Sequence, residues 1–150
     1  MPQSFVSLTC HVIFSTKQRE PLLVGDIVPR LFAYIGGTLT NLGCRLIAAG
    51  GTADHVHLLL SLAKNVAVTD LVRTVKAKAS GWIHEIFPAL RGFAWQTGYG
   101  AFTVSYSNLG RVRHYIEEQA EHHRVRSFQE EFLAFLRRHG IEYDERYIWE

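Results

Sequence analysis

The chain is organised around one stretch, Ala53-Asp54-His55-Val56-His57-Leu58-Leu59-Leu60-Ser61. Its alternation of apolar and other residues predicts a half-buried strand, with Val56 and Leu58 facing a core. His55 and His57 share the opposite face, with Cα atoms about 6 to 7 Å apart. Two imidazoles at this separation can hold one divalent metal ion between them. Because the His-x-His pattern is short, two half-exposed histidines that alternate by chance remain an alternative.

The composition predicts a single globular domain over residues 1–150. Apolar residues make up 47% of the 150 residues and charged residues 20%, which is typical of a folded chain rather than a disordered one. No apolar run approaches the roughly 20 residues of a membrane span, and the first residues do not form a secretory signal. Cys10 and Cys44 have no metal-ligand or redox spacing, so we expect core thiols in a reducing cytoplasm.

The order of predicted elements is strand, helix, strand, strand, helix, strand, helix. It indicates an α+β fold, a ferredoxin-like antiparallel sheet with helices on one face. A capping box from Ser127 to Glu130 begins one more helix, which Gly140 ends. Residues 127–150 are therefore an appended C-terminal helix and tail, and the apolar tail is expected to dock. Strands are predicted at 6–14, 45–49, 53–62 and 101–106, and the earlier helices at about 26–42, 68–86 and 108–122.

A second candidate group lies on the predicted helix 108–122. Tyr115 and Gln119 are four residues apart and so share one side of that helix. A tyrosine oxygen can attack phosphorus, and a metal ion on the phosphate oxygens offsets the weakness of a hydroxyl with a pKa of about 10. Gln119 can add an amide oxygen to His55 and His57, a set that suits Mg²⁺ or Mn²⁺ when phosphate completes the shell. The same spacing also occurs where a tyrosine and a glutamine only pack at the edge of a core, so this structural interpretation stays open.

These residues together resemble the HUH single-tyrosine transposases of the smallest bacterial insertion sequences, a family that includes REP-associated tyrosine transposases. Residues 11–17 resemble the opening strand of the family, residues 54–59 its metal strand, residues 95–102 the segment before its last strand and residues 115–119 its nucleophile helix. Two positions depart from the family pattern. Ala53 replaces a frequent proline, and Glu118 replaces a frequent asparagine, which puts an extra carboxylate near Gln119.

The resemblance implies a metal-dependent single-strand DNA endonuclease and strand transferase. Tyr115 would be the nucleophile and form a 5′-phosphotyrosine intermediate without ATP, while His55, His57 and Gln119 would bind Mg²⁺ or Mn²⁺. The resemblance also implies recognition of DNA hairpins at element ends, and homodimers in which the tyrosine helix can act in trans. Such a protein would act on DNA in the cytoplasm of a bacterium or archaeon, with no membrane partner.

The charge distribution suits an anionic ligand at the centre of the fold. Residues 64–110 carry five basic and two acidic side chains, whereas residues 127–150 carry three basic and six acidic ones. Lysine and arginine contacts with DNA phosphates give affinity and salt dependence but do not read the base sequence. The candidates for such contacts are Lys17, Arg19, Arg73, Lys76 and Lys78, although each can equally be ordinary solvated surface.

Two other functions stay open from the residues alone. A non-catalytic, domesticated nucleic-acid-binding module would need the basic side chains but no metal, so a chelator would leave its binding unchanged. A metal-dependent hydrolase of small phosphoesters would use His55 and His57 without a covalent intermediate and would give Tyr115 no role. If the nucleophile is another tyrosine, Tyr99 and Tyr106 are the nearest alternatives.

Overall fold

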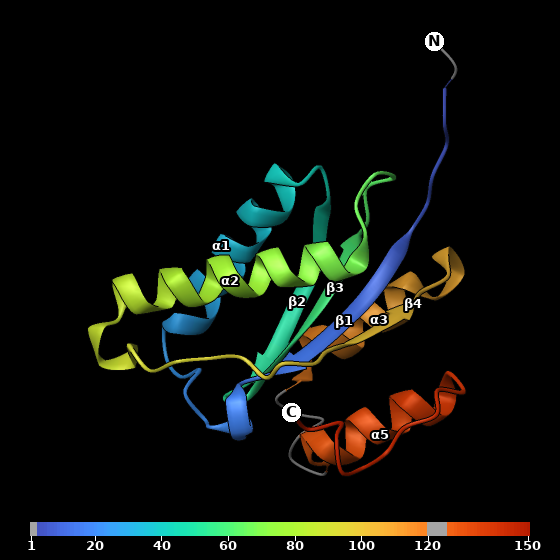
Figure 1. Ribbon diagram of the computed structural model, residues 1–150. Coiled ribbons are helices and arrows are strands. Elements are labelled where there is room, and N and C mark those ends of the chain that lie inside the picture. Colours follow the sequence, from blue (N-terminus) through green and yellow to red (C-terminus); the bar gives the residue numbers. More distant parts are fainter. Residues whose placement is uncertain (1–2, 120–125) are drawn as a thin grey trace.

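The computed structural model describes residues 3–119 and 126–150. A four-stranded antiparallel sheet with the order β2-β3-β1-β4 forms its centre (Figure 1). The histidine strand β3 therefore lies inside the sheet, between β2 and β1. The strands are β1 (Thr9–Ser15), β2 (Arg45–Thr52), β3 (His55–Ser61) and β4 (Gly100–Thr103), and the helices longer than one turn are α1 (Ile27–Asn41), α2 (Val68–Ile86), α3 (Leu109–Glu117) and α5 (Phe128–Arg138).

The helices α1 and α2 cover one face of this sheet (Figure 1). Val12 and Phe14 of β1 point into this layer together with Val56, Leu58 and Leu60 of β3, and all five are at most 1% exposed. Burial of such side chains contributes about 1.5–3 kcal/mol each. This layer is therefore the main core, and it holds the central strands in register.

The helices α3 and α5 pack on the opposite face. Leu59 of β3 and Ile116 of α3 belong to one buried cluster, and Ile13 of β1 belongs to another with Phe132 of α5. The predicted ferredoxin-like α+β fold and its appended C-terminal helix are confirmed. The structure adds that helices cover both faces of the sheet, so β3 is buried on both sides rather than half-buried.

Gly50 of β2 lets α3 approach the sheet closely. A Cβ atom at this position would collide with the backbone carbonyl of Ile116 in α3. A glycine is required wherever another backbone comes this near. Gly50 therefore determines how closely α3, which carries Tyr115, packs against the sheet.

Several element ends differ from the prediction. The helix α2 spans Val68–Ile86 as predicted, but β1 begins at Thr9. Val6 and Leu8 before it are exposed, although the Leu8 carbonyl oxygen still accepts a hydrogen bond from the Leu62 N–H. The strand β4 ends at Thr103. The helix predicted at 108–122 is seen as α3, and residues 120–122 lie outside the described residues.

The C-terminal segment folds back on the chain, as expected. The Ser127 hydroxyl accepts a hydrogen bond from the Glu130 N–H and caps α5. The Trp149 ring lies 6.0 Å from that of Phe132, and the Gly98 N–H donates to the Glu150 carbonyl oxygen. Among residues 3–119 and 126–150, no helix combines the length and apolarity needed to cross a bilayer.

Candidate active site

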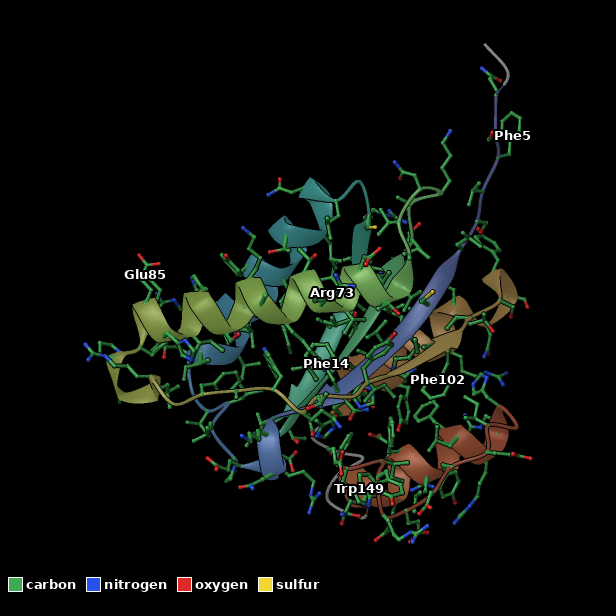
Figure 2. All side chains as sticks on the ribbon, viewed as in Figure 1. Phe5, Phe14, Arg73, Glu85, Phe102 and Trp149 are labelled. Atoms are coloured by element: carbon green, nitrogen blue, oxygen red, sulfur yellow. The ribbon has the colours of Figure 1, made fainter. Side chains whose placement is uncertain are left out.

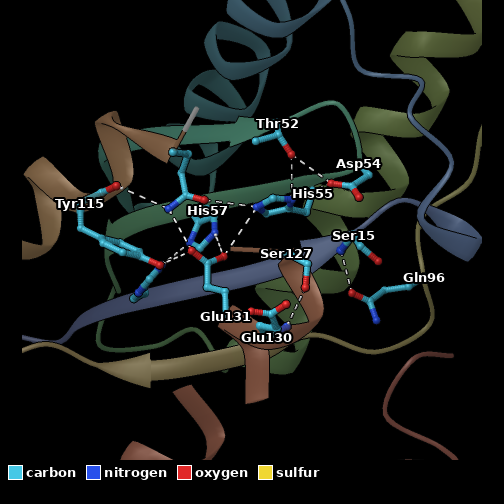
Figure 3. Close-up of polar contacts among 12 residues, drawn as sticks. Ser15, Thr52, Asp54, His55, His57, Gln96, Tyr115, Ser127, Glu130 and Glu131 are labelled. Atoms are coloured by element: carbon cyan, nitrogen blue, oxygen red, sulfur yellow. Dashed lines mark hydrogen bonds and ion pairs between the residues drawn. The ribbon is translucent and has the colours of Figure 1, made fainter. Parts of the chain in front are cut away.

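The two histidines of β3 point into the layer between the sheet and the helices α3 and α5, and both are fully buried. Asp54 and Thr52 hold the His55 ring, because Asp54 Oδ1 lies 2.7 Å and Thr52 Oγ1 3.0 Å from His55 Nδ1 (Figure 3). A carboxylate on Nδ1 favours the tautomer in which that nitrogen carries the proton. The Nε2 lone pair is then available on the side where His57 lies.

Glu131 of α5 joins the two histidines. Its Oε1 atom is 2.9 Å from His57 Nε2 and 3.7 Å from His55 Nε2. The residue is only 1% exposed, and burial of a carboxylate is unfavourable unless it is paired. The imidazole groups provide that pairing here, so Glu131 is part of the site rather than of the surface.

Tyr115 of α3 reaches the same carboxylate. Its hydroxyl donates a hydrogen bond to Glu131 Oε2, and its ring centroid is 6.0 Å from that of His57 (Figure 3). Burial, followed by the hydrogen bond and the negative charge of Glu131, raises the pKa of the Tyr115 hydroxyl above its usual 10. The phenol is therefore protonated at neutral pH, with a carboxylate in place to accept its proton.

Gln119 completes the group. Its Oε1 atom is 3.2 Å from His55 Nε2, and its Nε2 donates to Glu131 Oε2 at 3.3 Å. The structure thus brings together all four residues predicted for the chemistry, His55, His57, Tyr115 and Gln119. Glu118 is not among them, because it is exposed and its Oε2 lies 3.4 Å from His114 Nε2.

His11 of β1 supports His57 from behind. The distance between His11 Nε2 and His57 Nδ1 is 2.7 Å. Burial, and then the neighbouring His57, holds the pKa of His11 well below its usual range. His11 is therefore a neutral group that can orient His57, as residues behind a metal ligand commonly do.

The donor set fits a divalent metal ion. One ligand atom each from His55, His57 and Glu131 lies within 4.8 Å of the others. Two imidazole nitrogens and one carboxylate oxygen with further positions open form a known set for divalent transition metals, and the amide oxygen of Gln119 can add a fourth donor. The burial of all these residues explains why they need either an ion or each other.

The predicted phosphate contacts do not lie in this centre. Arg73 pairs with Asp70 at 2.7 Å, and Lys78 is exposed on the same helix. Figure 2 shows Arg73 on α2, the layer across the sheet from α5. Lys76 donates to the carbonyl oxygens of residues 96, 97 and 98, so its ammonium group binds a loop of its own chain.

Lys17 and Arg19 lie in the one-turn helix after β1. Lys17 is exposed, and the Arg19 guanidinium lies 5.8 Å from the ring centroid of Trp149 in the tail. The predicted basic residues thus lie apart from the group formed by His55, His57, Gln119 and Glu131, and their contact with DNA stays a prediction.

Glu131 and His11 were not predicted. Glu131 follows the buried Phe128 by three residues and precedes the buried Phe132 and Leu136, so it occupies an apolar position of the α5 stripe. A carboxylate at such a position is a signal that the sequence contained. His11 is two residues from Ile13 and therefore shares with it the strand face that α5 covers.

The fold and this centre define a class of protein, an α+β chain whose ferredoxin-like sheet gathers two histidines, a carboxylate and a tyrosine hydroxyl at one place. Residues 4–119 match the family described as Transposase IS200 like. The chain belongs to this family of IS200-like transposases, which confirms the resemblance seen in the sequence. Glu131 and α5 lie outside the matched residues.

Named relatives agree with this assignment. The chain is 30% identical over 117 residues to the ISDra2 transposase TnpA of Deinococcus radiodurans, a match that covers 75% of this chain and 84% of the relative. It is 27% identical over 117 residues to the transposase for insertion sequence element IS200 of Salmonella typhimurium, covering 74% of this chain and 76% of the relative.

Solved structures share the fold. A crystal structure of a protein from Deinococcus radiodurans R1 superposes with a TM-score of 0.65 at 28% identity, covering 79% of this chain and 96% of the other. The structure of a REP-associated tyrosine transposase bound to a REP hairpin gives a TM-score of 0.56 at 14% identity, covering 77% and 68%. The latter likeness concerns the fold alone.

Proposed function

We propose that this transposase cuts and rejoins single-stranded DNA through a covalent bond between Tyr115 and a 5′ phosphate. The observation that supports this most directly is the hydrogen bond from the Tyr115 hydroxyl to Glu131, a carboxylate that also contacts His57. A nucleophile, a proton acceptor and a metal-ligand set are thereby adjacent in one buried place, as such chemistry requires.

In the proposed step, the Tyr115 hydroxyl gives its proton to Glu131 and its oxygen attacks the scissile phosphorus. The bond between Tyr115 and phosphorus forms while the bond from phosphorus to the 3′ oxygen breaks, and the 3′ oxygen receives, by way of water, the proton that Glu131 took from Tyr115. One phosphoester replaces another, so no ATP is needed. Attack by a 3′ hydroxyl on the phosphotyrosine reverses the step and reseals DNA.

His55, His57 and Gln119 are proposed to hold Mg²⁺ or Mn²⁺, with Glu131 as a further oxygen donor. When bound, such an ion acts as a Lewis acid that draws charge from the phosphate oxygens. Asp54 and His11 keep the two imidazole rings turned toward this place. The Glu131 Oε1 atom lies 2.9 Å from His57 Nε2 and 3.7 Å from His55 Nε2, so it is placed to contact the same ion.

The proposed substrate is single-stranded DNA next to hairpins at element ends. A REP hairpin is bound by the REP-associated transposase with a similar fold, and the exposed Lys17, Arg73 and Lys78 are proposed, with Arg19, to contact duplex phosphates. We propose that residues 1–150 act as one domain, as a homodimer, on DNA in the cytoplasm. Since Tyr115 meets His57 of its own chain, the tyrosine is proposed to act in cis.

The test is covalent capture of single-stranded element ends that carry a 3′ label, the end that stays with the 5′ phosphate. With Mn²⁺ or Mg²⁺, a denaturing gel is expected to show a labelled band of higher mass, and a chelator is expected to abolish it. Tyr115→Phe should lose the band yet keep hairpin binding, whereas Tyr106→Phe, at an 85% exposed position, should keep both.

Other outcomes identify the alternatives. A band that persists in Tyr115→Phe would place the nucleophile elsewhere. DNA binding that a chelator leaves unchanged, with no cleavage in the presence of any divalent ion, would indicate a non-catalytic module. Cleavage without a covalent band would indicate a hydrolase.

A further inference from the structure

A cavity of about 190 Å³ lies between α3 and α5, and Tyr115 and Glu131 are part of its wall. It therefore opens on the nucleophile itself. His11 and Phe135 line it from the side of the sheet and of α5. A volume several times that of a water molecule, about 30 Å³, leaves room for a phosphodiester and part of a sugar.

Three arginines line the same cavity from separate segments. Arg111 belongs to the first turn of α3, Arg126 lies just before α5, and Arg138 is the last residue of α5. All three are exposed, and within residues 3–119 and 126–150 no ion pair is found for any of their guanidinium groups. The positive charge of Arg126 also acts on Tyr115, where it lowers the pKa against the larger raising effects.

The negative charge at the cavity wall is paired with groups of the site. Among the residues within 3–119 and 126–150 that line the cavity, Glu131 is the one carboxylate, and its two oxygens contact His57 and Tyr115. The cavity thus has a net positive, solvent-facing wall beside a buried, paired acid. Opposite charge at the nucleophile favours an anion there.

A second cavity of about 300 Å³ continues from the first, since the two share His11, Asn108, Phe135 and Arg138 in their walls. Its other walls include the Ser105 hydroxyl and the exposed His139. Hydroxyl, amide and guanidinium groups are the side chains that bind phosphate and sugar oxygens of nucleic acids. The two cavities together make a polar groove longer than one phosphate.

We propose that this groove holds the single DNA strand beside the scissile phosphate, and that Arg111, Arg126 and Arg138 bind its phosphodiester oxygens. The proposal rests on the proposed function of Tyr115 and names the strand-binding residues that serve it. The basic residues of α2 lie across the sheet and would contact a different part of the DNA. Single-strand and hairpin binding are then separable by substitution.

The test is binding of a fluorescein-labelled oligodeoxythymidylate, measured by fluorescence anisotropy over a series of NaCl concentrations. The double variant Arg111→Gln/Arg138→Gln is expected to bind at least about 10-fold more weakly at low salt. The slope of log binding constant against log NaCl concentration should become shallower by about 1.4, which is 0.7 for each lost phosphate contact. Its affinity for a hairpin without single-stranded flanks should stay within about twofold of the wild type.

The control is Arg45→Gln/Arg91→Gln, which removes the same charge at two exposed positions outside both cavities. It should leave single-strand affinity within about twofold. Equal losses of single-strand affinity in the two double variants, or no loss in Arg111→Gln/Arg138→Gln, would contradict the proposed binding groove. Thermal melting checks that each variant is folded.

Failure of the groove and failure of the proposed function give different results. If the wild type forms the covalent band while the arginine variant binds oligodeoxythymidylate normally, only the groove is wrong. If no covalent band forms but the arginine variant loses single-strand binding, the groove stands and the phosphotyrosine step is wrong.

Discussion

At the scale of single residues, Glu131 links two parts of the proposed chemistry. One carboxylate oxygen lies 2.9 Å from His57 Nε2, and the other accepts a hydrogen bond from the Tyr115 hydroxyl. The carboxylate is only 1% exposed, and imidazole, amide and hydroxyl groups partner it in place of water. The same residue can therefore support a metal ion on one side and take a proton on the other.

Glu131→Gln tests this double role. It keeps the shape but removes the charge, so we expect manganese affinity to fall about 10- to 100-fold and covalent capture to slow. Titration of Mn²⁺ followed by electron paramagnetic resonance measures the affinity without relying on activity. Glu118→Gln changes an exposed carboxylate one residue from Gln119 and should leave both unchanged. Equal manganese affinity in the Glu131 variant and the wild type would refute the role as a ligand.

Which site residues the sequence could predict depends on whether their signal is local. His55 and His57 alternate within one strand, and Tyr115 and Gln119 are one helical turn apart, so short patterns made all four candidates and the resemblance to the transposase family gave them their predicted roles. The contact between His57 and Glu131 joins residues 74 positions apart. It arises only when α5 packs on the sheet, and no short pattern encodes that packing.

At the scale of elements, the distance between α3 and β2 determines whether Tyr115 reaches Glu131. Gly50 allows the close approach, because any Cβ there meets the Ile116 carbonyl. The periodic pattern of α2 predicted its exact span, since its core stripe is continuous. The start of β1 was predicted too early because the alternation continues through Val6 and Leu8, which are exposed and precede the paired register of β1 with β3.

Gly50→Ala should therefore move α3 away from the sheet. We expect a loss of about 1–3 kcal/mol in the free energy of unfolding, as for overpacked cores, and a fall in covalent capture larger than the stability loss explains. Urea denaturation and the gel assay measure the two. The matched control is Gly37→Ala in α1, where a new Cβ meets nothing within 4 Å and should stabilise by about 0.5–1 kcal/mol. Equal, small effects of both changes would contradict the packing argument.

Lys76, one of the predicted phosphate contacts, binds a loop of its own chain. Its ammonium group donates to three carbonyl oxygens of the loop 96–98, and the same loop binds the tail through the Gly98 N–H. Burial lowers the pKa of Lys76 to about 8. The residue thus connects α2, the loop and the tail that follows α5.

The lowered pKa of Lys76 predicts a pH dependence of stability. Between about pH 8 and pH 10.5, the folded chain has released the Lys76 proton and the unfolded chain still holds it, so the unfolded state binds more protons and this group raises the free energy of unfolding as pH increases. The difference between wild type and Lys76→Met, measured by urea denaturation, should therefore grow in favour of the wild type over that range. Lys78→Met, at an exposed position, should give a constant difference, and a constant difference for Lys76→Met would contradict the expectation.

At the scale of the whole molecule, the sheet divides the proposed functions between its faces. The face under α1 and α2 holds the main core, while the face under α3 and α5 holds the histidines, Tyr115 and Glu131. A ferredoxin-like sheet could be predicted from the order of elements. That α5 would close the second face and contribute a side chain to its centre could not, because its apolar stripe fits any apolar surface.

The most direct test of the account is to locate the covalent bond itself. Wild-type protein is incubated with Mn²⁺ and single-stranded element ends, the DNA is digested with nuclease, and tryptic peptides are sequenced by tandem mass spectrometry. The account predicts a nucleotide mass on the phenol oxygen of Tyr115 and on no other residue. A nucleotide on Tyr99, Tyr106 or any non-tyrosine side chain, or cleaved DNA with no modified peptide, would contradict it.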